Sequence, residues 1–78
     1  MSIRDEVLAA VEAKKTMPSP EERRALRETG GLSVAELARI LGVPGPTLSR
    51  WELGSMAPRG VNLACYREAL DALTEAIR

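Results

Sequence analysis

The sequence predicts an all-α fold on the strength of three observations. The 78 residues include 11 Ala and 10 Leu against only 5 Val and 3 Ile, which favours helices over strands. Ser-x-x-Asp or Ser-x-x-Glu, the pattern that caps a helix start, begins at Ser2, Ser19 and Ser33. Glycines and prolines separate the apolar segments, where helices would end. The chain is long enough for one domain over residues 1–78 and one hydrophobic core.

Two helices are expected in the first part of the chain. Apolar residues at helical spacing predict an N-terminal helix over residues 3–15, followed by a linker at 16–19 that contains a proline. Residues 20–29 form the second expected helix, because Pro20 suits a first helical position and glycines follow residue 29.

The region 20–60 holds two more predicted helices separated by a very short turn. Ser33 caps the first, which ends at Gly42, a residue that can adopt the left-handed conformation beyond a helix. Pro44 precedes the second, at 45–53, where another proline falls in the first turn and removes no hydrogen bond. So tight a turn forces the two helices to cross steeply, as in a helix-turn-helix that presents its second helix to a DNA major groove.

A C-terminal helix is expected at 61–77. The sequence also contains two apolar stripes, each of which has two possible roles. One stripe lies on the last helix and comprises Leu63, Tyr66, Leu70, Leu73 and Ile77. The other lies on the first helix and comprises Ile3, Val7 and Val11. Each stripe could line the interface of a homodimer or close the core of the monomer itself.

Composition narrows the classes of function. With no His and one cysteine, Cys65, we expect no metal site, no cofactor and no enzymatic activity. The lone thiol and the absence of a long apolar run predict a cytoplasmic protein that does not bind membranes. Net charge is zero, but residues 24–60 carry five arginines against three glutamates, so the middle of the chain is basic.

Residues 24–60 resemble the Cro/repressor-type (XRE-like) helix-turn-helix family of small phage and bacterial transcriptional regulators. The matching stretches are Leu26-Arg27, Gly31 to Ala38, Leu41 to Val43, Thr47 to Glu52, Gly54 and Pro58. The resemblance implies a five-helix lambda-repressor-like domain that binds operator sequences in double-stranded DNA, as a Cro-like repressor with no small-molecule ligand. It further implies that residues 45–53 are the recognition helix.

The resemblance also implies roles for individual residues. Positions 45, 46 and 50 would face base edges, positions 33, 34, 47 and 59 would lie near phosphates, and position 49 offers a small donor for either. The implied DNA-binding residues are therefore Ser33, Val34, Gly45, Pro46, Thr47, Ser49, Arg50 and Arg59. Arg27 and Glu52 are implied to form a structural ion pair beneath the recognition helix.

Departures from the family pattern favour a second hypothesis. Val34 stands where many members have a Gln, and Gly45 and Pro46 replace the polar residues that usually read bases. Direct readout would then depend on Arg50 together with DNA shape. The alternative is a protein-interaction module of the antitoxin or anti-regulator type, which keeps the fold but has weak or no DNA binding.

Three other features have simpler interpretations. We expect Trp51 to be a core residue and Cys65 to be an inert thiol. Arg23 and Arg24 lie among glutamates on the second helix, so we expect solvated ion pairs there and not a second DNA-binding patch.

Overall fold

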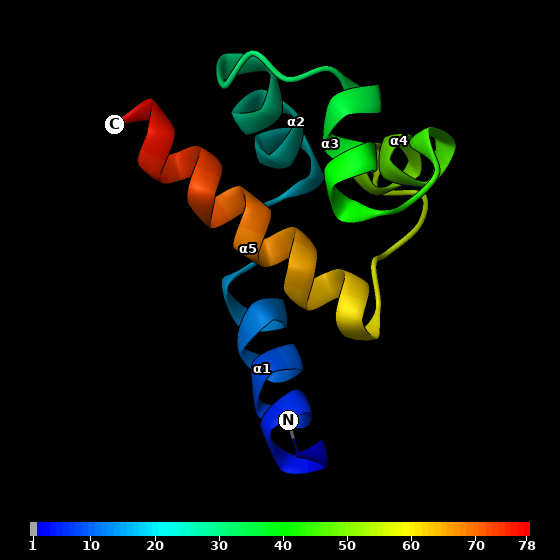
Figure 1. Cartoon of the computed structure of the whole chain (residues 1–78), viewed down its shortest axis with the longest axis vertical. Coiled ribbons are helices and arrows are strands. Elements are labelled where there is room, and N and C mark those ends of the chain that lie inside the picture. The colour runs from blue at the N-terminus through cyan, green and yellow to red at the C-terminus, as the bar shows by residue number, and fades with distance from the viewer. Residues whose placement is uncertain (1) are drawn as a thin grey trace.

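The computed structural model describes residues 2–78, which form five helices and no strands (Figure 1). The helices are α1 (Ile3–Thr16), α2 (Pro20–Thr29), α3 (Val34–Leu41), α4 (Gly45–Leu53) and α5 (Gly60–Ile77). The predicted bounds agree with these to within one residue, and the all-α prediction is confirmed. Over the described residues, no helix has both the length and the hydrophobicity that crossing a membrane requires.

Local hydrogen bonds explain where the helices begin and end. Ser19 and Ser33 each form a complete capping box with the glutamate three residues later, whereas Ser2 only accepts a hydrogen bond from the Asp5 N–H. Gly42 and Gly54 end α3 and α4 with φ angles of 71° and 76°, in the left-handed region that favours glycine. These caps make the boundaries a local property of the sequence.

The hydrophobic core lies between α5 and the three helices α2, α3 and α4. Its buried members are Leu37, Ala38, Leu48, Trp51, Tyr66, Leu70 and Leu73. The rings of Trp51 and Tyr66 lie 5.1 Å apart between centroids, so α4 and α5 meet through an aromatic pair. The expectation that Trp51 is a core residue is thus confirmed. Of the two stripes left open, the one on α5 closes the monomer core through Leu63, Tyr66, Leu70 and Leu73, whereas its last member, Ile77, is 40% exposed.

The expectation that Arg23 is solvated is wrong. Arg23 is buried, and its guanidinium lies 5.7 Å from the centroid of the Tyr66 ring. The long side chain of Arg23 therefore packs as part of the core, with its charge over an aromatic face. Arg24, by contrast, forms the exposed ion pair that was expected, with Glu28 at 3.0 Å.

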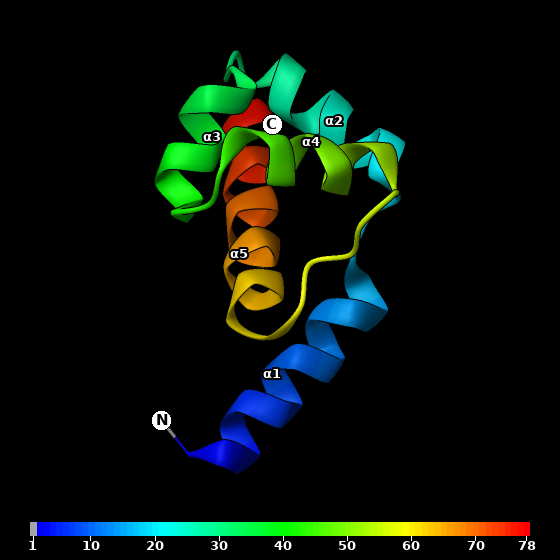
Figure 2. The ribbon, with the colours of Figure 1, turned by 90° about the vertical axis from the view of Figure 1, so that its right-hand side faces the viewer.

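Helix α1 projects from the other helices and packs against α5 (Figures 1 and 2). Only Ala13 of α1 is buried, while Ile3, Val7 and Val11 are between 47 and 79% exposed. The apolar stripe of α1 therefore does not close the monomer core. The small side chain of Ala13 allows α1 to approach α5 closely, and this contact turns the larger aliphatic residues outward.

Candidate nucleic-acid interface

A turn of three residues connects α3 to α4. Gly42 takes the left-handed conformation, and the Val43 N–H donates a 3.0 Å hydrogen bond to the Ala38 carbonyl, which closes the end of α3. Pro44 then starts α4, whose Thr47 N–H donates to the Pro44 carbonyl at 3.0 Å. Because Ala38 is buried and small, the two helices can cross at close range. The turn therefore produces the steep crossing expected of a helix-turn-helix.

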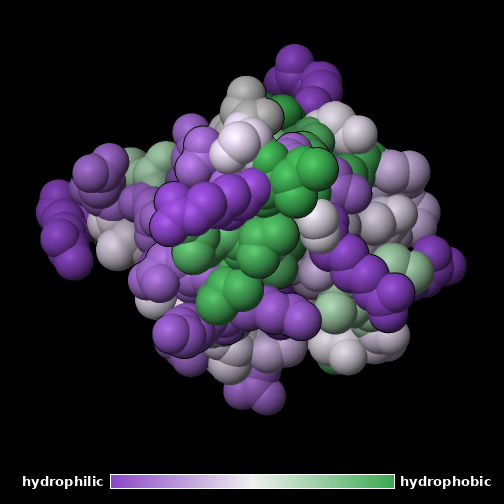
Figure 3. All heavy atoms as spheres, turned by 90° about the horizontal axis from the view of Figure 1, so that it is seen from below, coloured by the Kyte–Doolittle hydropathy of each residue, from purple (hydrophilic) through white to green (hydrophobic). Residues whose placement is uncertain are grey.

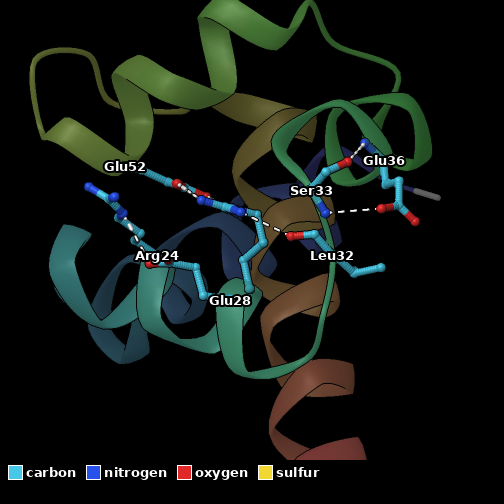
Figure 4. A network of polar contacts seen from close by, with 7 residues as sticks. Arg24, Glu28, Leu32, Ser33, Glu36 and Glu52 are labelled. Carbon is cyan, nitrogen blue, oxygen red and sulfur yellow. Dashed lines mark hydrogen bonds and ion pairs between the residues drawn. The ribbon is translucent and has the colours of Figure 1, made fainter.

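A buried ion pair fixes α4 against α2. Arg27 Nε donates to Glu52 Oε2 at 2.7 Å, and Arg27 Nη2 donates to Glu52 Oε1 at 2.9 Å. A third bond joins Arg27 Nη1 to the Leu32 carbonyl at 2.9 Å, just before α3 (Figure 4). The hydrogen bond to Glu52 raises the pKa of Arg27 above its ordinary value. One guanidinium thus ties together α2, α4 and the segment that leads into α3.

The rotation of α4 follows from its buried residues. Leu48, Trp51 and Glu52 face the protein interior. The opposite face is consequently turned to solvent, where Pro46 and Arg50 are exposed. The positions between the two faces are half-buried, and they are Gly45, Thr47 and Ser49. Across the described residues, Arg50 takes part in none of the ion pairs, so its guanidinium is available to an external acceptor.

Of the remaining predicted contact residues, the structure brings Val34 next to α4. Val34 and Ser49 line one shallow depression between α2, α3 and α4, together with Arg24. Arg24 was not among the predicted contacts. Its position on α2 in the sequence carries no sign that it borders the same depression as Ser49. Arg59 is exposed at the position directly before α5.

The start of α3 is less open to an anion than the sequence suggests. The Ser33 N–H donates to Glu36 Oε1 at 3.1 Å, and the Glu36 N–H donates to Ser33 Oγ at 3.0 Å (Figure 4). Hydrogen bonding from the Ser33 backbone lowers the pKa of Glu36, so this carboxylate is ionised at neutral pH. It places a negative charge at the helix end where a phosphate would bind. The capping pattern predicts this contact, and the contact works against phosphate binding at this helix start.

Comparison with known proteins supports the description of α3 and α4 as a helix-turn-helix. A family model described as helix-turn-helix matches residues 24–72, which span the part of the chain from α2 into α5. No curated protein and no solved structure gives a significant match. Helix α1 lies outside the matched residues.

Proposed function

Because the chain belongs to the Cro/repressor-type helix-turn-helix family of DNA-binding regulators, we propose that it is a Cro-like repressor that inserts α4 into the major groove. The observation that carries this proposal is the exposed face of α4, on a helix held by the Arg27–Glu52 pair, with an Arg50 that forms no ion pair with residues 2–78. A groove about 12 Å wide accepts one α-helix. A helix fixed from beneath can enter it without losing further conformational freedom.

Within this proposal, bases are read by few side chains. Arg50 donates to O6 and N7 of a guanine, the contact that a guanidinium makes best in the major groove. Pro46 contacts a thymine methyl, and Gly45 lets the backbone come close to the DNA. Since Gly45 and Pro46 donate no side-chain hydrogen bond, sequence-dependent DNA shape supplies the rest of the specificity. We therefore expect a short and tolerant recognition sequence.

Phosphate contacts come from the edges of the same face. Thr47 and Ser49 are half-buried hydroxyl donors on α4, and Arg59 is an exposed cation beyond it. At the start of α3, Ser33 is occupied by its own cap, so the Val34 backbone N–H is the donor that we assign to a phosphate. The Glu36 carboxylate weakens that contact.

The regulator binds a two-fold operator as a homodimer in this account. Two recognition helices then occupy successive major grooves, about 34 Å apart. A single α4 with one strong base contact discriminates weakly, and a second copy doubles the contacts that are read. The operator is accordingly expected to be an inverted repeat.

The proposal is tested by selecting bound sequences from random duplex DNA with the full chain. Enrichment of an inverted repeat with a guanine in each half-site is the expected result. Affinity for the selected duplex should also fall steeply as the salt concentration rises. Binding releases cations that are condensed on the DNA phosphates, and added salt opposes that release. Failure to enrich any sequence, with no binding even at low ionic strength, would contradict the proposal.

The competing function is a protein-interaction module with weak or no DNA binding. Glu36 favours it, because an ionised carboxylate at the start of α3 opposes phosphate there. The zero net charge of the chain also favours it. Under this hypothesis the selection from random duplex DNA enriches no sequence, and DNA does not compete with the protein partner for the exposed face of α4.

A further inference from the structure

The outward face of α1 is an apolar surface that the DNA-binding proposal does not use. It consists of Ile3, Val7, Leu8 and Val11, and each of these side chains is about half exposed or more. Val61 on α5, which is 68% exposed, lines the neighbouring groove between α1 and α5. Seen from the end of the molecule where α1 lies, hydrophobic residues form one patch with hydrophilic side chains around it (Figure 3). A continuous apolar patch on so small a protein marks an interaction site.

The spacing of the patch is self-complementary. Ile3, Val7 and Val11 form one row with a residue every four positions, and Val7 is at its centre. A two-fold axis at Val7 stacks Val7 on its own copy and places Ile3 against Val11 of an antiparallel second α1. Side chains of similar size then meet in three layers, as an interface between identical surfaces requires.

The charges of α1 disfavour a parallel pair. Its first turn is acidic, with Asp5 and Glu6, and its last turn is basic, with Lys14 and Lys15. A parallel pair would place like charges side by side, whereas in the antiparallel pair centred on Val7 the acidic residues Asp5 and Glu6 lie opposite Ala9 and Leu8 of the other copy, so that no like charges meet. The chain as a whole has zero net charge, so two copies do not repel each other at long range.

We propose that the α1 face (Ile3, Val7, Leu8 and Val11) is the interface of an antiparallel homodimer that forms without DNA. Figures 1 and 2 place α1 at the end of the molecule away from α3 and α4, so a copy docked there leaves the face of α4 uncovered. The inference concerns α1 alone and is separate from the two-fold operator binding proposed above.

The size of the patch sets the strength of the dimer. One 14-residue helix on each side gives an interface at or below the lower end of the about 1,200–2,000 Å² that stable complexes bury. We therefore expect a dissociation constant on the order of 1–100 µM.

Sedimentation equilibrium of the full chain without DNA, from about 1 to 500 µM, tests the proposal. The wild type should convert from monomer to dimer in this range, and Val7→Asp should weaken dimerisation at least about tenfold. Ile40→Asp is the matched control, because Ile40 on α3 is 65% exposed and Val7 is 55% exposed. It should sediment as the wild type does. A wild type that stays monomeric, or a dimer that Ile40→Asp disrupts and Val7→Asp does not, overturns the proposal.

A cross-linking experiment distinguishes the antiparallel arrangement from other contacts. In a Cys65→Ser background, Val7→Cys should oxidise readily to a disulfide-linked dimer, because the two-fold axis brings the two thiols together. Ile40→Cys in the same background should remain monomeric. Circular dichroism of each variant checks that the helices are retained. Efficient cross-linking of Ile40→Cys with none of Val7→Cys overturns the α1 interface.

The dimer and the DNA-binding proposal can fail separately. On a duplex with a single half-site, Val7→Asp should bind as the wild type does, because α1 lies away from α4 (Figures 1 and 2). A protein that forms dimers but does not bind DNA would contradict the proposed function alone. A protein that stays monomeric at every concentration tested but binds half-sites would contradict the α1 interface alone.

Discussion

Arg27 and Glu52 lie 25 residues apart in the chain and meet in two parallel hydrogen bonds of 2.7 and 2.9 Å. Both side chains are buried, with 10 and 5% of their surface exposed. A paired guanidinium and carboxylate satisfy each other in this geometry, but either one alone would be a buried charge without a partner. The position of α4 therefore depends on both residues being present.

Removing one partner of this pair should be strongly destabilising. We expect Arg27→Ala to lower the free energy of unfolding by about 3–5 kcal/mol, because Glu52 is left buried and unpaired. Urea denaturation followed by circular dichroism measures this. Arg24→Ala is the control on the same helix, and its exposed pair with Glu28 should contribute no more than about 0.5 kcal/mol. Equal losses in the two variants would contradict a structural role for the buried pair.

Neutralising Glu36 should strengthen DNA binding. Glu36→Gln keeps a side chain that can complete the capping box of Ser33, but it removes the negative charge from the start of α3. We expect affinity for DNA to rise by about three- to tenfold at low salt. Fluorescence anisotropy with a labelled duplex gives the comparison, and Glu75→Gln on α5 serves as the control. Unchanged affinity in Glu36→Gln would place the start of α3 away from the phosphates.

Alkaline pH should destabilise the protein through Tyr66. Burial raises the pKa of its hydroxyl to about 12, against about 10 in the unfolded chain. Between these values the folded protein holds a proton that the unfolded chain releases, so the contribution of Tyr66 to stability is complete below pH 10 and is lost as the pH rises to 12. The loss should reach about 1 kcal/mol by pH 11. Urea midpoints at pH 7 and 11 measure it.

Tyr66→Phe is the control for this pH dependence. Over the described residues, the buried Tyr66 hydroxyl has no hydrogen-bond partner, so its removal at pH 7 should change stability by less than about 1 kcal/mol. The variant should show a smaller loss between pH 7 and 11 than the wild type. An identical loss in both proteins would assign the alkaline transition to other groups.

Arg50 should contribute sequence preference. We expect Arg50→Ala to weaken binding to the selected duplex by about 1–3 kcal/mol and to have a smaller effect on unrelated DNA. Competition assays with both duplexes measure the two effects. Arg4→Ala, which removes an exposed arginine from α1, should leave the preference intact. An equal loss on every duplex would make Arg50 a phosphate contact.

The sequence was sufficient for the elements because their ends depend on neighbouring residues. Ser19 and Ser33 cap helices within four residues, and Gly42 and Gly54 supply the left-handed turns. The rotation of α4 was also predictable, since Leu48 and Trp51 belong to the core. An apolar pattern of this kind places the intervening polar residues on the outside.

Relationships between helices were harder to predict. The spacing of Ile3, Val7 and Val11 indicates a helix but does not say which side of it approaches α5. In the structure that side carries Ala13, because a small residue permits close packing. Arg23 looked like one member of an exposed cluster, and only the fold brings it over Tyr66. The proximity of Arg24 to Ser49 likewise follows from how α2 and α4 pack.

The most direct test of the central claim is an NMR titration of the full chain with the duplex that selection recovers. Binding through α4 predicts that the largest shifts fall on the backbone amides of Gly45 and residues 47–50 and on the side-chain Nε–H of Arg50, while those of α1 stay nearly unchanged at fixed dimer fraction. Shifts confined to α1 or α5, or no shifts at low ionic strength, would contradict the claim that the exposed face of α4 reads DNA.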